Sequence, residues 1–196
     1  MQPNCEYLLR NATGARYESR PEISLNSENS LTSDVRASNP SLIARLQLSA
    51  QDIAWACSQV EHRQHKRIDG EWSPHQQVFH LLATEEQNYH ARIRRILEED
   101  TPVLVRWDNE AHMRETYTTA TPLMRLAEHF AAARTHTVEV LDALTVEQVR
   151  RKGVWPDGRT IDLAWLAEKA LWHGLDHLAC LLDLHGEMEP LQALPG

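Results

Sequence analysis

Cysteine and aromatic residues are scarce in this chain of 196 residues, which has three cysteines and 6% Phe, Trp and Tyr. Cys5, Cys57 and Cys180 are too few and too widely spaced for a disulfide framework or a Cys-x-x-Cys metal site. We therefore expect reduced thiols, as in a cytosolic protein. The core of a single domain of this length should consist mainly of Leu, Ala, Val and Ile.

The chain also lacks long apolar runs and an excess of positive charge. No apolar stretch approaches the roughly 20 residues that cross a bilayer, and the first residues lack the apolar core of a signal peptide. The net charge of -8 argues against nucleic acid, because phosphate binding needs a basic face. No run of Lys and Arg suggests an anionic membrane surface. We expect a cytoplasmic protein that binds neither nucleic acid nor membrane.

The polarity of the sequence changes near residue 40. Residues 1–39 are polar and show no sustained hydrophobic period, which predicts an irregular or flexible N-terminal arm. Asn39-Pro40 predicts a helix start, and apolar residues at helical spacing continue to about Lys66. We assign residues 40–186 to one folded domain and residues 187–196 to a C-terminal tail.

Three more helices are predicted after the first. Ser73-Pro74-His75-Gln76 is a capping box with proline at the first helical position, and this second helix ends before Thr101-Pro102. The third helix runs over about residues 121–144 and the fourth over about 160–186, where Gly186 is a natural C-cap. Residues 101–119 form a long connection, and no good strand pattern is present. These features predict an all-α four-helix bundle with one long crossover.

Two histidines four residues apart, His173 and His177, are the most informative feature of the chain. On a helix they lie one above the other, so both can bind one metal ion if a third ligand comes from elsewhere. His80, about two turns into the second helix, is the candidate third ligand. At helical spacing it points away from the predicted core stripe, which fits either a surface or a groove position.

These residues resemble a known family. Residues 72–83, in which Trp72-Ser73 precedes His80-Leu81, are similar to the Trp-Ser/Thr-x-x-x-x-x-x-His-Leu signature of the DinB/YfiT-like proteins. His173-Gly174-Leu175-Asp176-His177-Leu178 is similar to the His-x-x-x-His-Leu of that family's last helix. The resemblance covers about residues 41–186. It implies an up-down-down-up four-helix bundle in which His80, His173 and His177 bind one divalent metal, usually zinc or nickel.

The resemblance also directs attention to residues around the histidines. Three imidazoles that leave a coordination position open are typical of a catalytic metal site. Each ring needs an acceptor for its second N–H, and Asp176 is the best candidate, with Glu168 weaker. Trp165 and Trp172 share a face near the histidines, where they would wall a substrate pocket or a dimer interface, although plain burial in the core is the slightly favoured interpretation. Arg134 is a candidate for attracting an acidic substrate.

Three functions are compatible with these residues. The first is a metal-dependent transferase that joins a low-molecular-weight thiol to an electrophilic small molecule, since the family includes transferases that use bacillithiol or mycothiol. The second is a metal-dependent hydrolase that uses a metal-bound hydroxide. The third is a non-enzymatic metal-binding stress protein. A homodimer is expected, because related proteins are often homodimers.

Overall fold

The computed structural model describes residues 31–68 and 71–188, so most of the predicted N-terminal arm and C-terminal tail lies outside the described residues. The bundle is built from these long helical segments: α2 (Leu31–Val60), α3 (Pro74–Thr84) with the π-helical turn η2 (Glu85–Tyr89) and α4 (His90–Glu98), α6 (Leu123–Asp142), and α8 (Leu163–Met188). None of the described helices combines the length and apolarity needed to span a bilayer.

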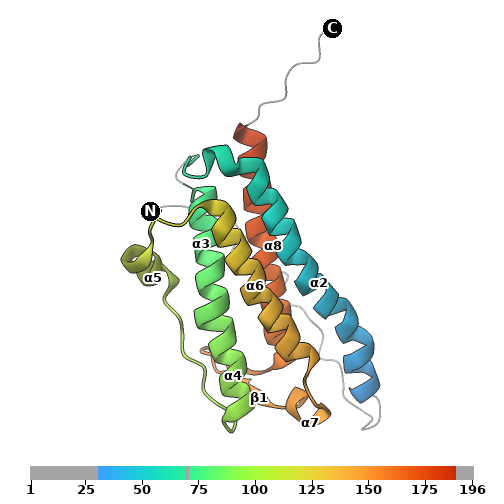
Figure 1. Ribbon diagram of the computed structural model, residues 1–196. Helices are drawn as coiled ribbons and strands as arrows, with labels where there is room; N and C mark the ends of the chain where they lie inside the picture. The colour runs from blue at the N-terminus through green and yellow to red at the C-terminus, as the bar shows by residue number, and fades with distance from the viewer. Residues whose placement is uncertain (1–30, 69–70, 189–196) are drawn as a thin grey trace.

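The four long segments follow the up-down-down-up path (Figure 1). In that view α2 rises, α3 with α4 descends, and α8 rises beside α2. The long crossover after α4 returns the chain to the upper end, so α6 also descends. Both α2 and α3 pack against α6 and α8. The predicted all-α four-helix bundle with one long crossover is therefore confirmed.

Two apolar clusters form the core. One cluster, near the lower end, includes Leu46, Ile93 and Leu166, and the other, near the upper end, includes Ile53 and Phe130. On each helix the two clusters are separated by buried polar residues or histidines at the same level of the bundle: Ser49 on α2, Thr84 and Glu85 at the α3/η2 junction, Arg134 and Thr137 on α6, and His177 on α8. We call this level the polar layer.

The connections hold more regular structure than the sequence predicted. The crossover contains a short helix α5 (Asn109–Thr116), and α6 is followed by α7 (Val146–Val149). Strands β1 (Lys152–Val154) and β2 (Thr160–Asp162) form an antiparallel hairpin, and the crossover joins it through a bridge between Val103 and Val154. Gly158 in the hairpin turn has a φ of 91°, which favours glycine. The expectation of no strand is wrong, because three-residue strands carry no readable alternation.

Two further expectations need correction. The first helix begins at Leu31, so Asn39-Pro40 lies inside α2 and does not start it. Cys57 is a buried free thiol as expected, but Cys180 is disulfide-bonded. The prediction of reduced thiols is therefore wrong for Cys180.

Candidate metal centre

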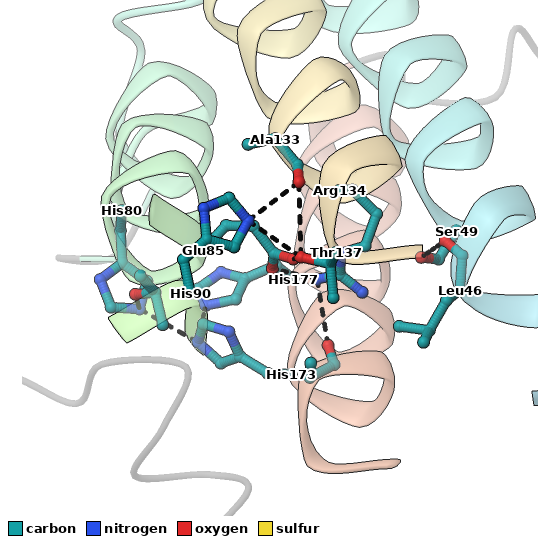
Figure 2. Close-up of polar contacts among 12 residues, drawn as sticks. Leu46, Ser49, His80, Glu85, His90, Ala133, Arg134, Thr137, His173 and His177 are labelled. Carbon is teal, nitrogen blue, oxygen red and sulfur yellow. Dashed lines mark hydrogen bonds and ion pairs between the residues drawn. The ribbon is translucent and has the colours of Figure 1, made fainter. Parts of the chain in front are cut away.

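The candidate site joins α3 to α8. The start of α3 is fixed by the predicted capping box, in which Ser73 accepts from the Gln76 backbone N–H and the Gln76 side chain accepts from the Ser73 backbone N–H. His80 follows on the second turn. On α8, His173 and His177 lie one turn apart on the face toward α3 (Figure 2). Two helices far apart in sequence thus bring three imidazoles together.

The three rings face one another through their Nε2 atoms. His173 Nε2 lies 3.1 Å from His80 Nε2 and 3.2 Å from His177 Nε2. One ring nitrogen from each histidine lies within 4.8 Å of the other two, and among the described residues this is the one cluster of its kind. Zinc–nitrogen bonds of about 2.0–2.1 Å at a tetrahedral angle separate two donors by about 3.3 Å. The two distances from His173 Nε2 match that requirement.

Burial keeps these histidines neutral. The side chains of His80 and His177 are only 1% and 3% exposed. Burial lowers the pKa of His80 and His173 well below the usual value, and the neighbouring histidines lower it further. Burial also lowers the pKa of His177 to about 4. A neutral imidazole carries the lone pair that a metal needs.

Gln77 selects the tautomer of His177. The Gln77 side-chain oxygen is hydrogen-bonded to His177 Nδ1, so this nitrogen must be the one that carries the proton. The lone pair of His177 then lies on Nε2, which faces the other two rings. Sequence reasoning missed Gln77, although it lies three residues before His80 and shares a face of α3 with it.

The described residues fit a divalent metal. With the proton of His177 on Nδ1, its Nε2 offers a lone pair to the other two Nε2 atoms. At most two N–H hydrogens, from His80 and His173, can then lie between the three ring nitrogens, and no carboxylate belongs to the cluster. A cation at the centre would satisfy all three lone pairs at once. The rings of Trp72 and Trp107 flank His80 and shield it from water, with their centres 5.1 Å and 6.2 Å from the centre of the His80 ring.

A cavity of about 440 Å³ opens beside the histidines. His80 and His173 line it together with aromatic, cationic and small polar residues: Thr84, Asn88, Tyr89, Arg92, Arg106, Trp107, Asn109, Trp155, Pro156, Asp157 and Lys169. These residues come from the helix formed by α3, η2 and α4, from the crossover, from the hairpin turn and from α8. The crossover and the hairpin turn, whose structure the sequence did not predict, therefore build part of the cavity wall. The size of the cavity suits a small organic molecule.

The predicted pocket residues do not line this cavity. Trp172 is 49% exposed, with the Arg45 guanidinium 6.0 Å from its ring centre. Trp165 packs edge-on against Trp155 at 4.9 Å, which places it behind the cavity wall. Trp155 takes the place that the sequence analysis gave to Trp165 and Trp172.

Arg134 is part of the core and not of the cavity. Its Nη2 lies 2.8 Å from Glu85 Oε2, and both side chains are 1% exposed. The same Nη2 donates to the Ala170 carbonyl of α8 at 3.2 Å. Thr137 donates to Glu85 Oε1 at 2.5 Å, and His90 Nε2 lies 3.0 Å from Thr137 Oγ1. Figure 2 shows this network beside the three histidines, within the polar layer.

The predicted ring-orienting acids are both half-buried on α8. Burial raises the pKa of Asp176 to about 6, while the positive charge of Lys169 opposes the rise. Because no described hydrogen bond joins Asp176 to His173, the role assigned to Asp176 stays a prediction, as does that of Glu168.

Comparison with known proteins agrees with this fold. A family model described as the DinB superfamily matches residues 4–181. The solved structure of YfiT from Bacillus subtilis, described as a probable metal-dependent hydrolase with an unusual four-helix bundle topology, has a TM-score of 0.70 at 21% identity, over 87% of this chain and 93% of that chain. A DinB-like protein of Bacillus subtilis, YjoA, has a TM-score of 0.50 at 19% identity, over 80% of this chain and 96% of that one. Curated proteins give no significant match.

Proposed function

This chain belongs to the DinB superfamily, and we propose that it is an enzyme that holds one divalent metal, zinc or nickel, through His80, His173 and His177. The proposal rests on one observation: the three Nε2 atoms converge at the wall of a cavity large enough for a small molecule. A metal that only held the fold together would need no cavity beside it.

The reaction we propose is transfer of a low-molecular-weight thiol to an electrophilic small molecule. A divalent cation at the histidines would favour the thiolate form of the thiol at neutral pH. In the overall reaction, the sulfur forms a bond to an electrophilic carbon, the leaving group departs with its electron pair, and the thiol proton passes to solvent. The nucleophile comes with the cosubstrate, so the protein needs no nucleophilic side chain of its own.

The residues around the cavity support thiol transfer over hydrolysis. A metal lowers the pKa of bound water, and hydrolysis is further assisted by a general base near the metal. Asp157 is the one carboxylate among the described residues that line the cavity, and its Oδ2 lies 2.7 Å from Arg159 Nη2 in an exposed ion pair. A carboxylate bound in this way is a poor base.

The chain's own residues would orient the reactants. Gln77 holds the His177 ring in place, and the rings of Tyr89, Trp107 and Trp155 supply apolar faces that exclude water from the cavity. Exclusion of water protects an electrophile from hydrolysis and strengthens every charge interaction inside the cavity.

Hydrolysis is the second candidate, because the structurally similar YfiT is described as a probable metal-dependent hydrolase. The two reactions differ in their need for a thiol. The enzyme incubated with 1-chloro-2,4-dinitrobenzene should react only when cysteine, glutathione, bacillithiol or mycothiol is added. Cleavage of 4-nitrophenyl acetate without any thiol would favour hydrolysis instead.

Metal content is the first measurement. Protein purified without a metal-affinity tag should contain about one zinc or nickel ion per chain by mass spectrometry. His177→Ala should lose it, whereas His129→Ala, an exposed histidine of α6, should keep it. A wild-type protein that is purified without metal and then binds neither zinc nor nickel would refute the proposal. The expected homodimer stays a prediction, which light scattering would test.

A further inference from the structure

More cations than carboxylates line the cavity beside the histidines. Arg92, Arg106 and Lys169 line it, against the single acid Asp157, whose charge is already matched by Arg159. An excess of cations around a small cavity predicts a ligand of opposite charge. The question is whether these cations belong to the cavity or only to the surface.

Arg92 is a buried cation of the cavity wall without a carboxylate partner among the described residues. Its side chain is buried, with only 7% of the residue exposed. Its Nη2 donates to the Val105 carbonyl at 2.9 Å, and its guanidinium lies 4.2 Å from the centre of the Trp155 ring. Neither partner carries a negative charge, and no carboxylate among the described residues pairs with Arg92.

Other arginines of the same bundle show what Arg92 lacks. Arg134 is fully buried and is paired with Glu85 at 2.8 Å. Arg95, three residues after Arg92 on α4, is paired with Glu99 at 2.6 Å. A buried guanidinium without an opposite charge costs folding free energy, and burial lowers the pKa of Arg92 accordingly. A bound anion would remove that cost.

Lys169 provides a second charge at the same wall. Its Nζ lies 5.6 Å from the centre of the Trp155 ring, against which Arg92 is also placed. Arg106 lies on the crossover, where its side chain is exposed at the edge of the cavity. Arg92 and Lys169 thus both lie at the Trp155 ring. An arginine binds the two oxygens of a planar carboxylate through parallel N–H donors, and a nearby lysine adds a second positive charge.

We infer that the cavity binds a small molecule bearing a carboxylate, which Arg92 and Lys169 hold while the remainder of the molecule extends toward the three histidines. The inference rests on the proposed function and names its substrate class. The carboxylate can belong to the electrophile or to the thiol, because both would enter the same cavity.

Binding tests the inference without any need for catalysis. Benzoate and benzamide have nearly the same shape and differ in charge, so each is titrated into the purified protein and into His177→Ala, with tryptophan fluorescence as the readout. Benzoate should bind about tenfold tighter than benzamide or better. The preference should persist in His177→Ala, where a contact between carboxylate and metal is excluded. Equal binding of the two probes would overturn the inference.

Charge-removing variants assign the preference to residues. Arg92→Gln and Lys169→Gln should each weaken benzoate binding about tenfold and leave benzamide unchanged. Arg94→Gln is the matched control, because Arg94 is exposed on the same helix and does not line the cavity. If Arg92→Gln does not fold, Lys169→Gln and the exposed Arg106→Gln still carry the test. Benzoate binding that survives these substitutions unchanged would contradict the inference.

The two proposals fail in different ways. A metal-free wild type would end the proposed function, yet the preference for benzoate would still be measurable. A metal-loaded protein without that preference would refute only the carboxylate. In an active enzyme, 4-chloro-3-nitrobenzoate and its amide are compared as electrophiles in Arg92→Gln. A KM that rises only for the benzoate assigns the carboxylate to the electrophile, and a KM that rises only for the thiol assigns it to the cosubstrate.

Discussion

The buried ion pair between Arg134 and Glu85 should be a major determinant of stability. It lies in the polar layer, where α6 meets the π-helical turn, and both side chains are 1% exposed. Arg134 also donates to the Ala170 carbonyl, so one guanidinium joins three of the four helical segments. We predict that Arg134→Met destabilises the protein far more than the loss of a surface arginine does.

The magnitude follows from what Arg134→Met leaves behind. The Glu85 carboxylate would keep its hydrogen bond from Thr137 but would lose the one cation paired with it among the described residues and remain buried. Removal of one partner from a buried pair costs about 3–5 kcal/mol. For a chain of this length each kcal/mol lowers Tm by about 2–4 °C, so the expected fall in Tm is about 6–20 °C.

The assay is urea unfolding and thermal unfolding of metal-stripped protein, so that metal binding does not add to the measured stability. Arg125→Met is the matched control, since Arg125 forms an exposed ion pair with Glu128 on the same helix. A pair of that kind contributes about 0–1 kcal/mol. The double variant Arg134→Met/Glu85→Gln should recover part of the loss, because it removes the stranded charge.

Two results would refute this reasoning. If Arg134→Met costs no more than Arg125→Met, the guanidinium of Arg134 does not neutralise a buried charge. If the double variant is as unstable as the sum of the single variants, Arg134 and Glu85 do not interact, and the short Nη2–Oε2 distance carries no energetic weight.

Three further predictions follow from single contacts. Gln77→Ala frees His177 Nδ1 and should weaken zinc binding about 10- to 100-fold in competition with a chromophoric chelator, whereas the exposed Gln87→Ala should not. Ser73→Ala removes the cap of α3 and should cost about 1 kcal/mol, or about 2–4 °C in Tm; an unchanged Tm would mean that the capping box is not formed in solution. Cys57 is 0% exposed, and burial raises its pKa to about 12. Iodoacetamide at pH 8 should therefore label Cys57 only after unfolding, and rapid labelling of the native protein would contradict its burial.

The sequence predicted the helices where local signals were strong. The capping box at Ser73 fixed the start of α3, and the spacing of apolar residues located α6 and α8 to within a few residues. The start of α2 was missed because residues 31–39 are polar and carry no hydrophobic period. The hairpin and α5 were missed because elements of three to eight residues are too short for periodicity to identify.

The metal centre was likewise predictable in part: its ligands could be found from the sequence, and the walls of the cavity could not. His173 and His177 were visible as a local pair, and the resemblance to DinB/YfiT-like proteins pointed to His80, which core periodicity alone had left between surface and groove. The cavity walls could not be predicted, since Trp107 and Trp155 lie in connections whose paths depend on the Val103–Val154 bridge. Trp165 was predicted at the pocket and lies directly behind it, because the Trp155 ring stands between Trp165 and the cavity.

Arg134 shows why buried polar residues are the hardest to interpret. In a helix an arginine ordinarily predicts a solvated position, and nothing local to α6 indicates a partner 49 residues away. The signal exists only after the helices are aligned. Then Ser49, Glu85, Arg134 and His177 interrupt the apolar stripes of four helices at one level, between the two apolar clusters. An isolated polar residue in a core stripe can be either buried or exposed, whereas polar residues that coincide at one level on all helices of a bundle indicate a buried polar layer. In this chain that layer contains the ion pair and His177, and His80 and His173 lie beside it, so the burial that makes Arg134 costly to remove also keeps His177 neutral and ready to bind a metal.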